Sequence, residues 1–318
     1  MATSEQLKSL IKAHYDEKGE QFRTVVLQIA AYEAQQGHQK LARELKTYLE
    51  KAGRSKGNVI SLNQQNELVA YTPANCHIND LVVNDDLRAR IERILQEFRQ
   101  REKLQRYGLA NRRKILLEGD PGTGKTMTAK VIASELDLPL YTIQMDKLVT
   151  KYMGETSLKL RQIFESIDNV LGIYLFDEFD AIGADRSLDS DVGEMRRVLN
   201  SFLQFIEQNQ SESIIVAATN NRKMLDQALF RRFDDVLHYS LPSNDEVVTL
   251  LNYKLSFSPV DLHITDDIVR AAEGLSHAEI ARACEDFIKS AIMHNGNADQ
   301  RTLIRMLNDR VLVYGKEA

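Results

Sequence analysis

A glycine-rich stretch that ends in lysine and threonine carries the clearest chemical signal in the sequence. Residues 119–126 read GDPGTGKT and fit the phosphate-binding pattern GxxxxGK[ST]. Glycines let the backbone bend so that successive N–H groups face phosphate oxygens, and the start of a helix attracts anions. The lysine is expected to reach the β- and γ-phosphates of a nucleotide, and the threonine hydroxyl to bind Mg²⁺. The predicted nucleotide-binding residues are Asp120, Pro121, Gly122, Thr123, Gly124, Lys125, Thr126 and Met127.

Two adjacent carboxylates at the end of an apolar run form a second chemical signal. Residues 173–176 read IYLF and lead directly into Asp177 and Glu178. A buried strand that ends in two charges is unfavourable unless the charges meet a cation or hydrogen bonds. Asp177 is therefore predicted to hold Mg²⁺ together with Thr126, and Glu178 to orient and deprotonate the attacking water. An acidic strand end by itself is often only a helix cap or a solvated turn, but the phosphate-binding pattern in the same chain favours the catalytic interpretation.

Short apolar runs that alternate with amphipathic segments are expected to position these residues. The runs predict buried strands, and the segments between them fit helices with one apolar face. Strands that alternate with helices indicate a parallel sheet covered by helices on both faces, so the predicted fold class is α/β, of the P-loop NTPase type. The predicted strands are 114–118, 140–144, 173–176, 214–218 and 236–239, and the main helices among them are 125–136, 155–167 and 191–208.

Helical segments precede this alternating region. Residues 4–52 predict a bundle of two or three one-sided helices, in which Val25, Val26 and Ile29 are among the apolar positions. After a polar, glycine-containing stretch, one further helix is predicted over 85–106, with its apolar residues on one face.

No strand pattern remains after residue 242. Helices are predicted to begin near Ser243 or Asn244 and near Thr265, and a third is predicted over 277–293. These segments indicate a second, smaller helical unit after the sheet. The predicted domains are an N-terminal helical domain at 1–55 that recruits a partner or client, a linker at 56–77, a large α/β domain at 78–242 and a small helical lid at 243–318.

The overall composition is that of an ordinary globular protein. Hydrophobic residues make up 43% and charged residues 27%, and the net charge of −5 gives no general attraction to nucleic acid or anionic membranes. No apolar run is long enough to span a bilayer, and the N-terminus lacks the features of a signal peptide, so a cytoplasmic protein is expected. Cys76 and Cys284 lie in no CxxC or Cys/His cluster, so no structural zinc site is predicted.

In combination, these motifs resemble those of the AAA ATPases, within the broader AAA+ group, over residues 78–310. The resemblance implies that the chain binds ATP with Mg²⁺ and hydrolyses it. The run IIVAATN, which ends at Asn220, is similar to the family's sensor-1 strand, and this implies that Asn220 helps to position the lytic water. The segment 225–234, LDQALFRRFD, resembles the one that supplies arginine fingers. It implies that Arg231 and Arg232 reach the γ-phosphate bound by a neighbouring subunit, where a guanidinium binds oxygens in a fork.

Three further segments resemble parts of the same family. The sequence KYMGE is similar to its first pore loop, which implies that Tyr152 and Met153 grip an unfolded polypeptide. An aromatic residue beside methionine is more often core packing, but the flanking lysine, glycine and glutamate indicate a loop. Residues 274–280 resemble the lid segment near the adenine, and 78–82 the segment on the other side of the base. Relatives usually have glycine where His277 stands, so His277 is expected to cap a helix rather than contact the nucleotide.

The resemblance also implies how the protein assembles and what kind of substrate it acts on. Arginine fingers that act on a neighbour require a homo-oligomeric ring, which in this family usually closes as a hexamer. Remodelling or threading of a protein client is the favoured activity. A nucleic-acid motor or loader would predict basic residues at the pore tip or a DNA-binding appendage, and neither is evident. A regulatory switch with slow turnover is the third alternative.

The layout of a short helical N-terminal domain before one AAA module resembles a narrower group as well. It is similar to compact bacterial AAA ATPases that are encoded beside a subtilisin-like serine protease. Such pairs are associated with phage defence or plasmid incompatibility. The resemblance therefore implies that a serine protease is a partner of this ATPase.

Overall fold

The computed structural model describes residues 25–26, 29–30, 32, 67–148, 153–182, 192–220, 230–294 and 298–314. The chain divides into two compact units, Met1–Ser61 and Leu62–Ala318. In the first unit the described residues are helical, and Val25, Val26 and Ile29 are buried, as their one-sided spacing predicts. The rest of the predicted N-terminal bundle lies outside the described residues.

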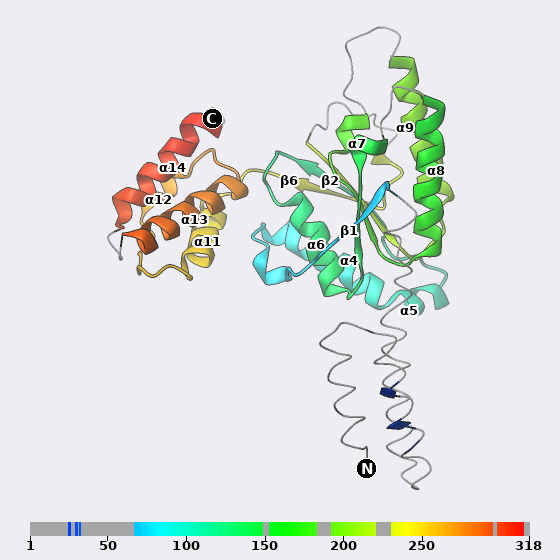
Figure 1. The fold of residues 1–318 in the computed structure, drawn as a ribbon, viewed down its shortest axis with the longest axis horizontal. Helices are drawn as coiled ribbons and strands as arrows, with labels where there is room; N and C mark the ends of the chain where they lie inside the picture. The colour runs from blue at the N-terminus through cyan, green and yellow to red at the C-terminus, as the bar shows by residue number, and fades with distance from the viewer. Residues whose placement is uncertain are drawn as a thin grey trace. The chain divides into compact units, whose positions relative to one another are not determined.

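The second unit is built on one mixed sheet (Figure 1). Within the described residues, six strands pair in the order β1-β3-β4-β5-β2-β6. The predicted parallel α/β sheet is confirmed, because only the edge pair β1–β3 is antiparallel. The strands are β1 (Val69–Thr72), β2 (Lys114–Gly119), β3 (Leu140–Ile143), β4 (Ile173–Phe176), β5 (Ile214–Thr219) and β6 (Asp235–Tyr239).

Continuous apolar sequence places the central strands in the interior. Every residue of β4 and β5 is buried, which suits strands covered on both faces, where no side is left for polar residues. Side chains alternate between the faces. Along β4, Tyr174 and Phe176 belong to one core cluster, whereas Ile173 and Leu175 belong to the other.

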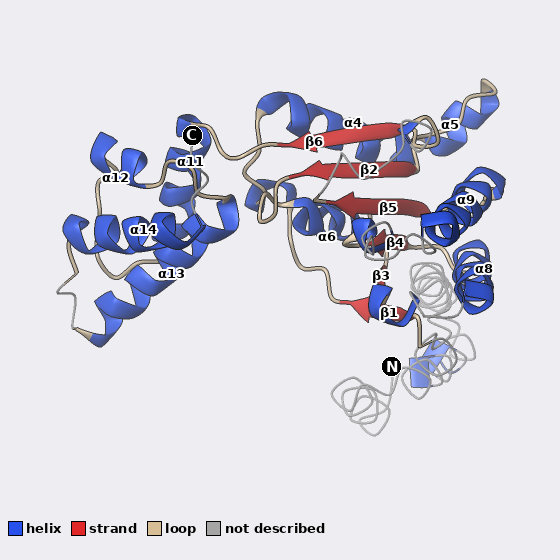
Figure 2. Ribbon diagram, turned by 90° about the horizontal axis from the view of Figure 1, so that it is seen from above, coloured by secondary structure: helices blue, strands red, loops and turns tan. Residues whose placement is uncertain are grey.

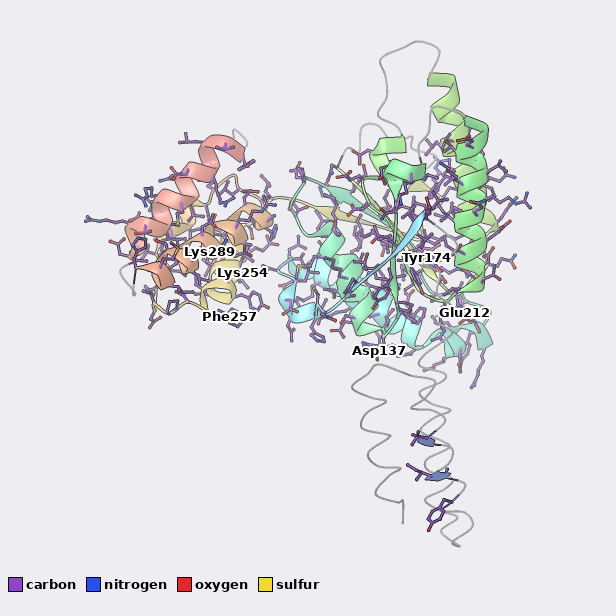
Figure 3. All side chains as sticks on the ribbon, in the orientation of Figure 1. Asp137, Tyr174, Glu212, Lys254, Phe257 and Lys289 are labelled. Carbon is purple, nitrogen blue, oxygen red and sulfur yellow. The ribbon has the colours of Figure 1, made fainter. Side chains whose placement is uncertain are left out.

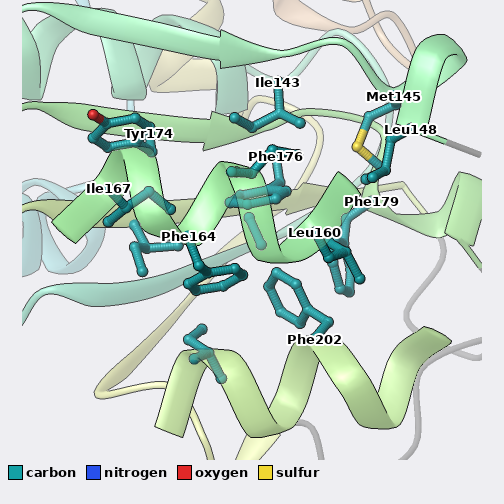
Figure 4. Packing of buried hydrophobic residues seen from close by; sticks show 14 of the residues in the cluster. Ile143, Met145, Leu148, Leu160, Phe164, Ile167, Tyr174, Phe176, Phe179 and Phe202 are labelled. Atoms are coloured by element: carbon teal, nitrogen blue, oxygen red, sulfur yellow. The ribbon is translucent and has the colours of Figure 1, made fainter. Parts of the chain in front are cut away.

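Two pairs of long helices supply the rest of these two cores (Figure 2). Helices α4 and α6 pack with Ile173 and Leu175, and α8 and α9 pack with Tyr174 and Phe176. On the α8–α9 side the rings of Phe176 and Phe202 meet edge to face, with 5.2 Å between their centroids (Figure 4). The helices are α4 (Asp85–Arg99), α6 (Lys125–Glu135), α8 (Met153–Asn169) and α9 (Val192–Gln208), with shorter turns η2 (Ile78–Asp80), α7 (Met145–Leu148) and η3 (Phe179–Ile182).

Two elements of the sheet domain differ from the sequence prediction. The edge strand β1 was not predicted, and its pairing with β3 is reinforced by a 2.7 Å hydrogen bond between the hydroxyls of Thr72 and Thr142. The helix predicted over 85–106 instead breaks at Gln100, and a short helix α5 (Arg101–Arg106) follows. The apolar stripe of α4 ends at Phe98 and α5 buries no residue, so nothing in the core holds the helix straight beyond that point.

Helices alone follow the last strand among the described residues, and they enclose a core of their own. Helix α11 begins with a capping box, in which Ser243 N donates to the Glu246 carboxylate at 2.8 Å. The last helix, α14, was not predicted, although Leu303 and Leu307 stand four residues apart and are fully buried. Figure 3 shows Lys254 and the exposed Phe257 on this helical part. The helices are α11 (Asn244–Leu255), α12 (Asp266–Ala271), α13 (His277–Met293) and α14 (Gln300–Tyr314).

None of the helices that the structure describes combines the length and the apolar character needed to cross a bilayer.

Candidate nucleotide-binding and catalytic site

The glycine-rich loop joins β2 to α6, as the sequence predicts. Gly124 immediately precedes the helix with a left-handed φ of 104°, and Gly122 has a φ of 75°. A side chain is strained in this backbone region, so glycine is needed for the turn. The turn directs the start of α6, with its free N–H groups and positive dipole end, toward the loop. This arrangement suits a bound phosphate group.

The lysine that follows the loop is held within it. Lys125 Nζ donates to the carbonyl oxygens of Gly119, at 2.9 Å, and of Asp120, at 2.7 Å. Burial lowers the pKa of Lys125 from its usual value, and the nearby carboxylates of Asp177, Asp120 and Asp180 oppose this effect. Among the described residues this buried ammonium group donates to carbonyl oxygens, so a bound phosphate would give it a direct ionic partner.

The threonine and the first carboxylate of the two predicted motifs meet directly. Thr126 Oγ1 donates to Asp177 Oδ2 at 2.7 Å. A hydroxyl and a carboxylate are hard oxygen donors, which Mg²⁺ prefers. Within the described part of the chain no group of three or more potential ligands gathers. The pair therefore fits an ion that takes its remaining ligands from phosphates and water, as Mg²⁺ does in nucleotide sites.

The second carboxylate sits on a strained backbone. Glu178 has a φ of 52°, in the left-handed region that residues other than glycine seldom occupy. Its backbone N–H donates to the preceding side chain, at Asp177 Oδ1, over 3.0 Å. Phe176 and Phe179 on either side are fully buried, so they fix the backbone on both sides of the turn. The exposed Glu178 side chain is thereby presented to the cavity next to the phosphate loop.

Asn220 lies at the end of β5, the strand between β4 and β2. It lines the same cavity as Glu178 and the phosphate loop. Its backbone N–H donates to Asp180 Oδ1 at 3.2 Å. The sequence analysis did not single out Asp180, although it stands three residues after Asp177 and its carboxylate anchors the strand end that carries Asn220.

One cavity of about 430 Å³ brings most of the predicted residues together. Among the predicted nucleotide-binding residues Asp120 is the exception, since it lines a neighbouring smaller cavity. The segments 78–82 and 274–280, which the sequence analysis places on either side of the base, also line the main cavity, whereas Leu250, Lys254 and Ala281 were not singled out. The predicted residues on the main cavity are Pro121, Gly122, Thr123, Gly124, Lys125, Thr126, Met127, Asp177, Glu178 and Asn220, and the others include Asp80, Leu81, Val82, Leu250, Lys254, His277, Ala278 and Ala281.

Two hydrogen bonds connect the walls of this cavity. Ala278 N, in the first turn of α13, donates to the carbonyl oxygen of Gly122 at 2.9 Å. The Tyr253 hydroxyl on α11 donates to Asp80 Oδ1 at 2.6 Å. The pKa of Asp80 is lowered, first by the backbone N–H of His77 and then by this tyrosine hydroxyl. The phosphate loop and the segment around Asp80 are therefore each tied to a C-terminal helix.

His277 does not cap helix α13, contrary to the sequence expectation. The N-cap residue is Ser276, whose side chain accepts from Glu279 N at 3.4 Å. His277 is the first residue of the helix and is among the residues that line the cavity. Both ring nitrogens are buried and have no hydrogen-bond partner in the structure as described. Burial lowers the pKa of His277, with the carboxylate of Glu246 opposing the shift, so the ring is neutral near neutral pH.

The predicted arginine fingers and pore residues lie away from the cavity or outside the described residues. Arg231 and Arg232 are exposed in the turn before β6, and neither lines the cavity. Arg232 forms an ion pair with Glu207 at the end of α9. Tyr152 lies outside the described residues, and Met153 is the first residue of α8.

Comparisons with known proteins identify the family of this chain. The sequence pattern described as "ATPase family associated with various cellular activities (AAA)" matches residues 115–241. An uncharacterized AAA family ATPase, y4kL, from Sinorhizobium fredii is 33% identical over 97% of this chain and 96% of its own length. A putative 26S proteasome regulatory subunit homolog from Methanothermobacter marburgensis is 29% identical over 76% of this chain and 64% of its own length.

A solved structure supports the fold. The crystal structure of the FIGL-1 AAA domain superimposes with a TM-score of 0.62 at 20% identity, over 83% of this chain and 91% of that chain. With a relative of the same family matching over nearly its whole length, the chain belongs to the AAA family of ATPases, and it is an enzyme that hydrolyses ATP.

Proposed function

We propose that the protein hydrolyses Mg·ATP in a ring of identical subunits, a hexamer, in order to remodel or thread a protein client. The observation that carries the proposal is the convergence of Lys125, the Thr126–Asp177 pair and Glu178 on one cavity. These residues supply a cation for the phosphates, oxygen donors for a metal and a carboxylate for the attacking water. They are the parts that phosphoryl transfer to water requires.

Each side chain has a distinct role in this scheme. Lys125 leaves its carbonyl partners and binds the β- and γ-phosphates, while Thr126 and Asp177 hold Mg²⁺. Mg²⁺, when bound, neutralises charge on the β- and γ-phosphates. Glu178 orients the water and accepts its proton, and Asn220 holds the water from the neighbouring strand.

The arginines support action between subunits. Neither Arg231 nor Arg232 lines its own cavity, so a role at a γ-phosphate requires the cavity of another copy. Arg232 is already paired with Glu207, whereas no ion partner for Arg231 occurs among the described residues. We therefore propose that Arg231 is the principal finger and that Arg232 orients the turn.

The client is proposed from the pore segment and from the relatives. Met153 is the first residue of α8, and Tyr152 precedes it in the sequence; α8 packs on the sheet core beside β4, the strand that leads to Glu178. A change at the γ-phosphate therefore has a packed route toward the pore residues. One relative is a putative homolog of a proteasome regulatory subunit, which favours a protein as the client.

Domain roles and partners complete the proposal. We assign residues 1–55 to an N-terminal helical domain that recruits the client or a subtilisin-like serine protease, 78–242 to the ATPase domain and 243–318 to the lid. Of the predicted linker at 56–77, the strand β1 belongs to the ATPase sheet, because it pairs with β3. In the protease partnership the ATPase would serve phage defence or plasmid incompatibility. Both cysteines are free thiols, which suits a reducing compartment, and we propose the cytoplasm.

Mixing two inactive variants tests the ring mechanism. Glu178→Gln removes the base but keeps the fingers, and the double variant Arg231→Ala/Arg232→Ala removes the fingers but keeps the base. Each alone is expected to lose at least about 100-fold in ATP turnover. In a mixture, a Glu178→Gln subunit completes the site of its finger-less neighbour, so turnover reappears.

Arg270→Ala serves as the matched control, because Arg270 is an exposed arginine that pairs with Asp267 at 3.7 Å. It should retain the full rate. An inactive mixture, or full activity of the double variant alone, would contradict fingers acting between subunits. Stimulation of the unmodified protein by DNA and not by unfolded protein would replace the protein client with a nucleic acid.

A further inference from the structure

The turn that carries Arg231 is anchored to the sheet immediately after that residue. Asp234 Oδ2 accepts hydrogen bonds from two successive backbone N–H groups, those of Arg113 and Lys114, both at 2.9 Å. In return, Asp234 N donates to the carbonyl oxygen of Lys114 at 2.7 Å. Hydrogen bonds that a carboxylate accepts are stronger than those of a neutral oxygen. The end of the turn is therefore joined to the start of β2 through both its side chain and its backbone.

Neighbouring contacts hold the residues around Asp234. Phe233 is buried in the core on the α8–α9 side of the sheet, and Arg232 pairs with Glu207 on α9. On the other side, Asp235 begins β6 and forms an ion pair with Arg90 on α4. The proposed finger stands just before this anchored segment and is exposed.

The turn and the phosphate loop lie at opposite ends of the same pair of strands. β2 and β6 are parallel, and Figure 2 shows them side by side and pointing the same way. Asp235 at the start of β6 faces Ile115, whereas Tyr239 at its end faces Gly119, where the phosphate loop begins. Four residues of strand span about 13 Å. This separation agrees with a finger that acts on another copy of the chain.

A finger that acts on another subunit cannot be positioned by the nucleotide site of its own subunit. Its accuracy depends on how firmly its own turn is held, because a misplacement of about 1 Å can cost about 100-fold in rate. Catalytic side chains are held in place by a supporting layer of hydrogen bonds and packing. The bonds of Asp234 to the start of β2 supply such support from the most rigid part of the fold, the buried sheet.

We propose that Asp234 is a positioning residue that holds the turn so that Arg231 reaches the γ-phosphate bound by a neighbouring subunit. Loss of the carboxylate releases the turn from the start of β2, and the guanidinium then spreads over many positions. Asp234 does not line the cavity of its own subunit, so ATP binding there is unaffected. This inference rests on the proposed ring mechanism and names the group that fixes the finger's turn.

Two substitutions at this position provide the first test. Asp234→Ala removes the acceptor, whereas Asp234→Asn keeps an oxygen in its place and loses the charge. Asp234→Ala should lower turnover at saturating ATP by about 10- to 100-fold, with an unchanged dissociation constant for ATP measured by calorimetry. Asp234→Asn should recover most of the turnover. A fall in ATP affinity that matches the fall in turnover would mean a general disturbance of the protein and would overturn the inference.

Mixed subunits separate positioning of the finger from support of the fold. In a mixture with Glu178→Gln, whose turn is intact, Asp234→Ala subunits receive a well-placed finger and should regain turnover. Glu178→Gln/Asp234→Ala should not restore turnover to the finger-less variant, although Glu178→Gln does. Glu178→Gln/Asp267→Ala is the matched control, because Asp267 is an exposed aspartate that pairs with Arg270 at 3.7 Å, and it should restore turnover as Glu178→Gln does.

If Asp234→Ala does not fold, Asp234→Glu takes its place, because it keeps the charge but moves the carboxylate by one methylene group. Full restoration of the finger-less variant by Glu178→Gln/Asp234→Ala would overturn the role of Asp234. Failure of Glu178→Gln to rescue Asp234→Ala would do the same, since the defect would then lie in the subunit's own site. Full activity of the finger-less variant alone would instead contradict the ring mechanism, so the two failures are distinguishable.

Discussion

Replacing Gly122 by alanine should disturb the joint between the phosphate loop and helix α13. A Cβ atom at this position would lie 2.5 Å from Ser276 Oγ and 3.1 Å from the Ala278 Cβ. Ser276 Oγ is the cap of α13 and accepts from Glu279 N. To make room, the Ser276 side chain must turn away and give up the cap, or the helix must move and lose the bond from Ala278 N to Gly122 O.

The expected loss in the free energy of unfolding has two contributions, one from the backbone conformation and one from the contact with Ser276. A left-handed φ costs an alanine roughly 1–2 kcal/mol, and loss of a serine cap costs about 0.5–2 kcal/mol. Gly122→Ala should therefore lower the free energy of unfolding by about 1.5–4 kcal/mol. Gly108→Ala supplies the matched control, since Gly108 has nearly the same φ, +72° against +75°, but nothing within 4 Å of the added Cβ. The control should show the backbone part alone, about 1–2 kcal/mol.

The assay combines urea denaturation with ATP binding by calorimetry. Gly122→Ala should shift the urea midpoint further than Gly108→Ala, and it alone should weaken ATP binding, by about fivefold or more if one hydrogen bond across the joint is lost. Adding Ser276→Gly removes the obstructing hydroxyl and should recover part of the binding. Equal destabilisation by the two glycine substitutions, with ATP affinity intact in both, would refute the inference that this contact couples the loop to the helix.

The two remaining predictions concern the phosphate cation and the pore. Burial lowers the pKa of Lys125 from its usual 10.5, so the ammonium group loses its proton at a lower pH than an exposed lysine does. As the pH rises, ATP affinity should therefore begin to fall before pH 10.5 is reached; a calorimetric series from about pH 7 to 10 with constant affinity would contradict this. Tyr152→Ala should leave basal ATP hydrolysis unchanged and abolish remodelling of an unfolded protein client, measured by loss of its fluorescence; undiminished remodelling would remove Tyr152 from the pore.

Short-range signals account for the parts of the fold that the sequence predicted. The apolar runs of β4 and β5 are buried along their whole length, so the strands could be recognised without knowledge of their neighbours. The edge strand β1 has only four residues, and its pairing with β3 creates it. Helix α14 carries its signal in only two buried residues, Leu303 and Leu307. Elements defined by so few interior contacts cannot be separated from loops by periodicity.

The residues of the candidate site also fall into a group that local motifs predict and a group that they do not. Lys125, Thr126 and Asp177 follow from local motifs, and the structure brings them to one cavity. Lys254 lines that cavity from helix α11, and no local pattern marks it, whereas the segment of His277 was marked only by family resemblance. For His277 the relevant fact, a ring buried without partners, exists only after α13 has packed against the phosphate loop.

Departures from local rules distinguish the site from the rest of the fold. Two described residues other than glycine have a left-handed φ, Asp137 and Glu178. Asp137 follows the end of α6, where its N–H donates to Ser134 O at 3.3 Å and Leu138 N donates to Ala133 O at 3.0 Å. A helix end of this kind commonly uses the left-handed conformation, so Asp137 needs no functional explanation.

Glu178 has no such local reason, because it follows a strand rather than a helix. Its conformation is held by the buried Phe176 and Phe179, and Phe179 packs on Phe202 of α9 with 4.6 Å between ring centroids. The same cavity contains the buried cation of Lys125. Strain and a buried charge each reduce stability, and they persist together where bound substrate compensates for them. Their coincidence on one cavity is a physical argument, independent of motif recognition, that this is where ATP is hydrolysed.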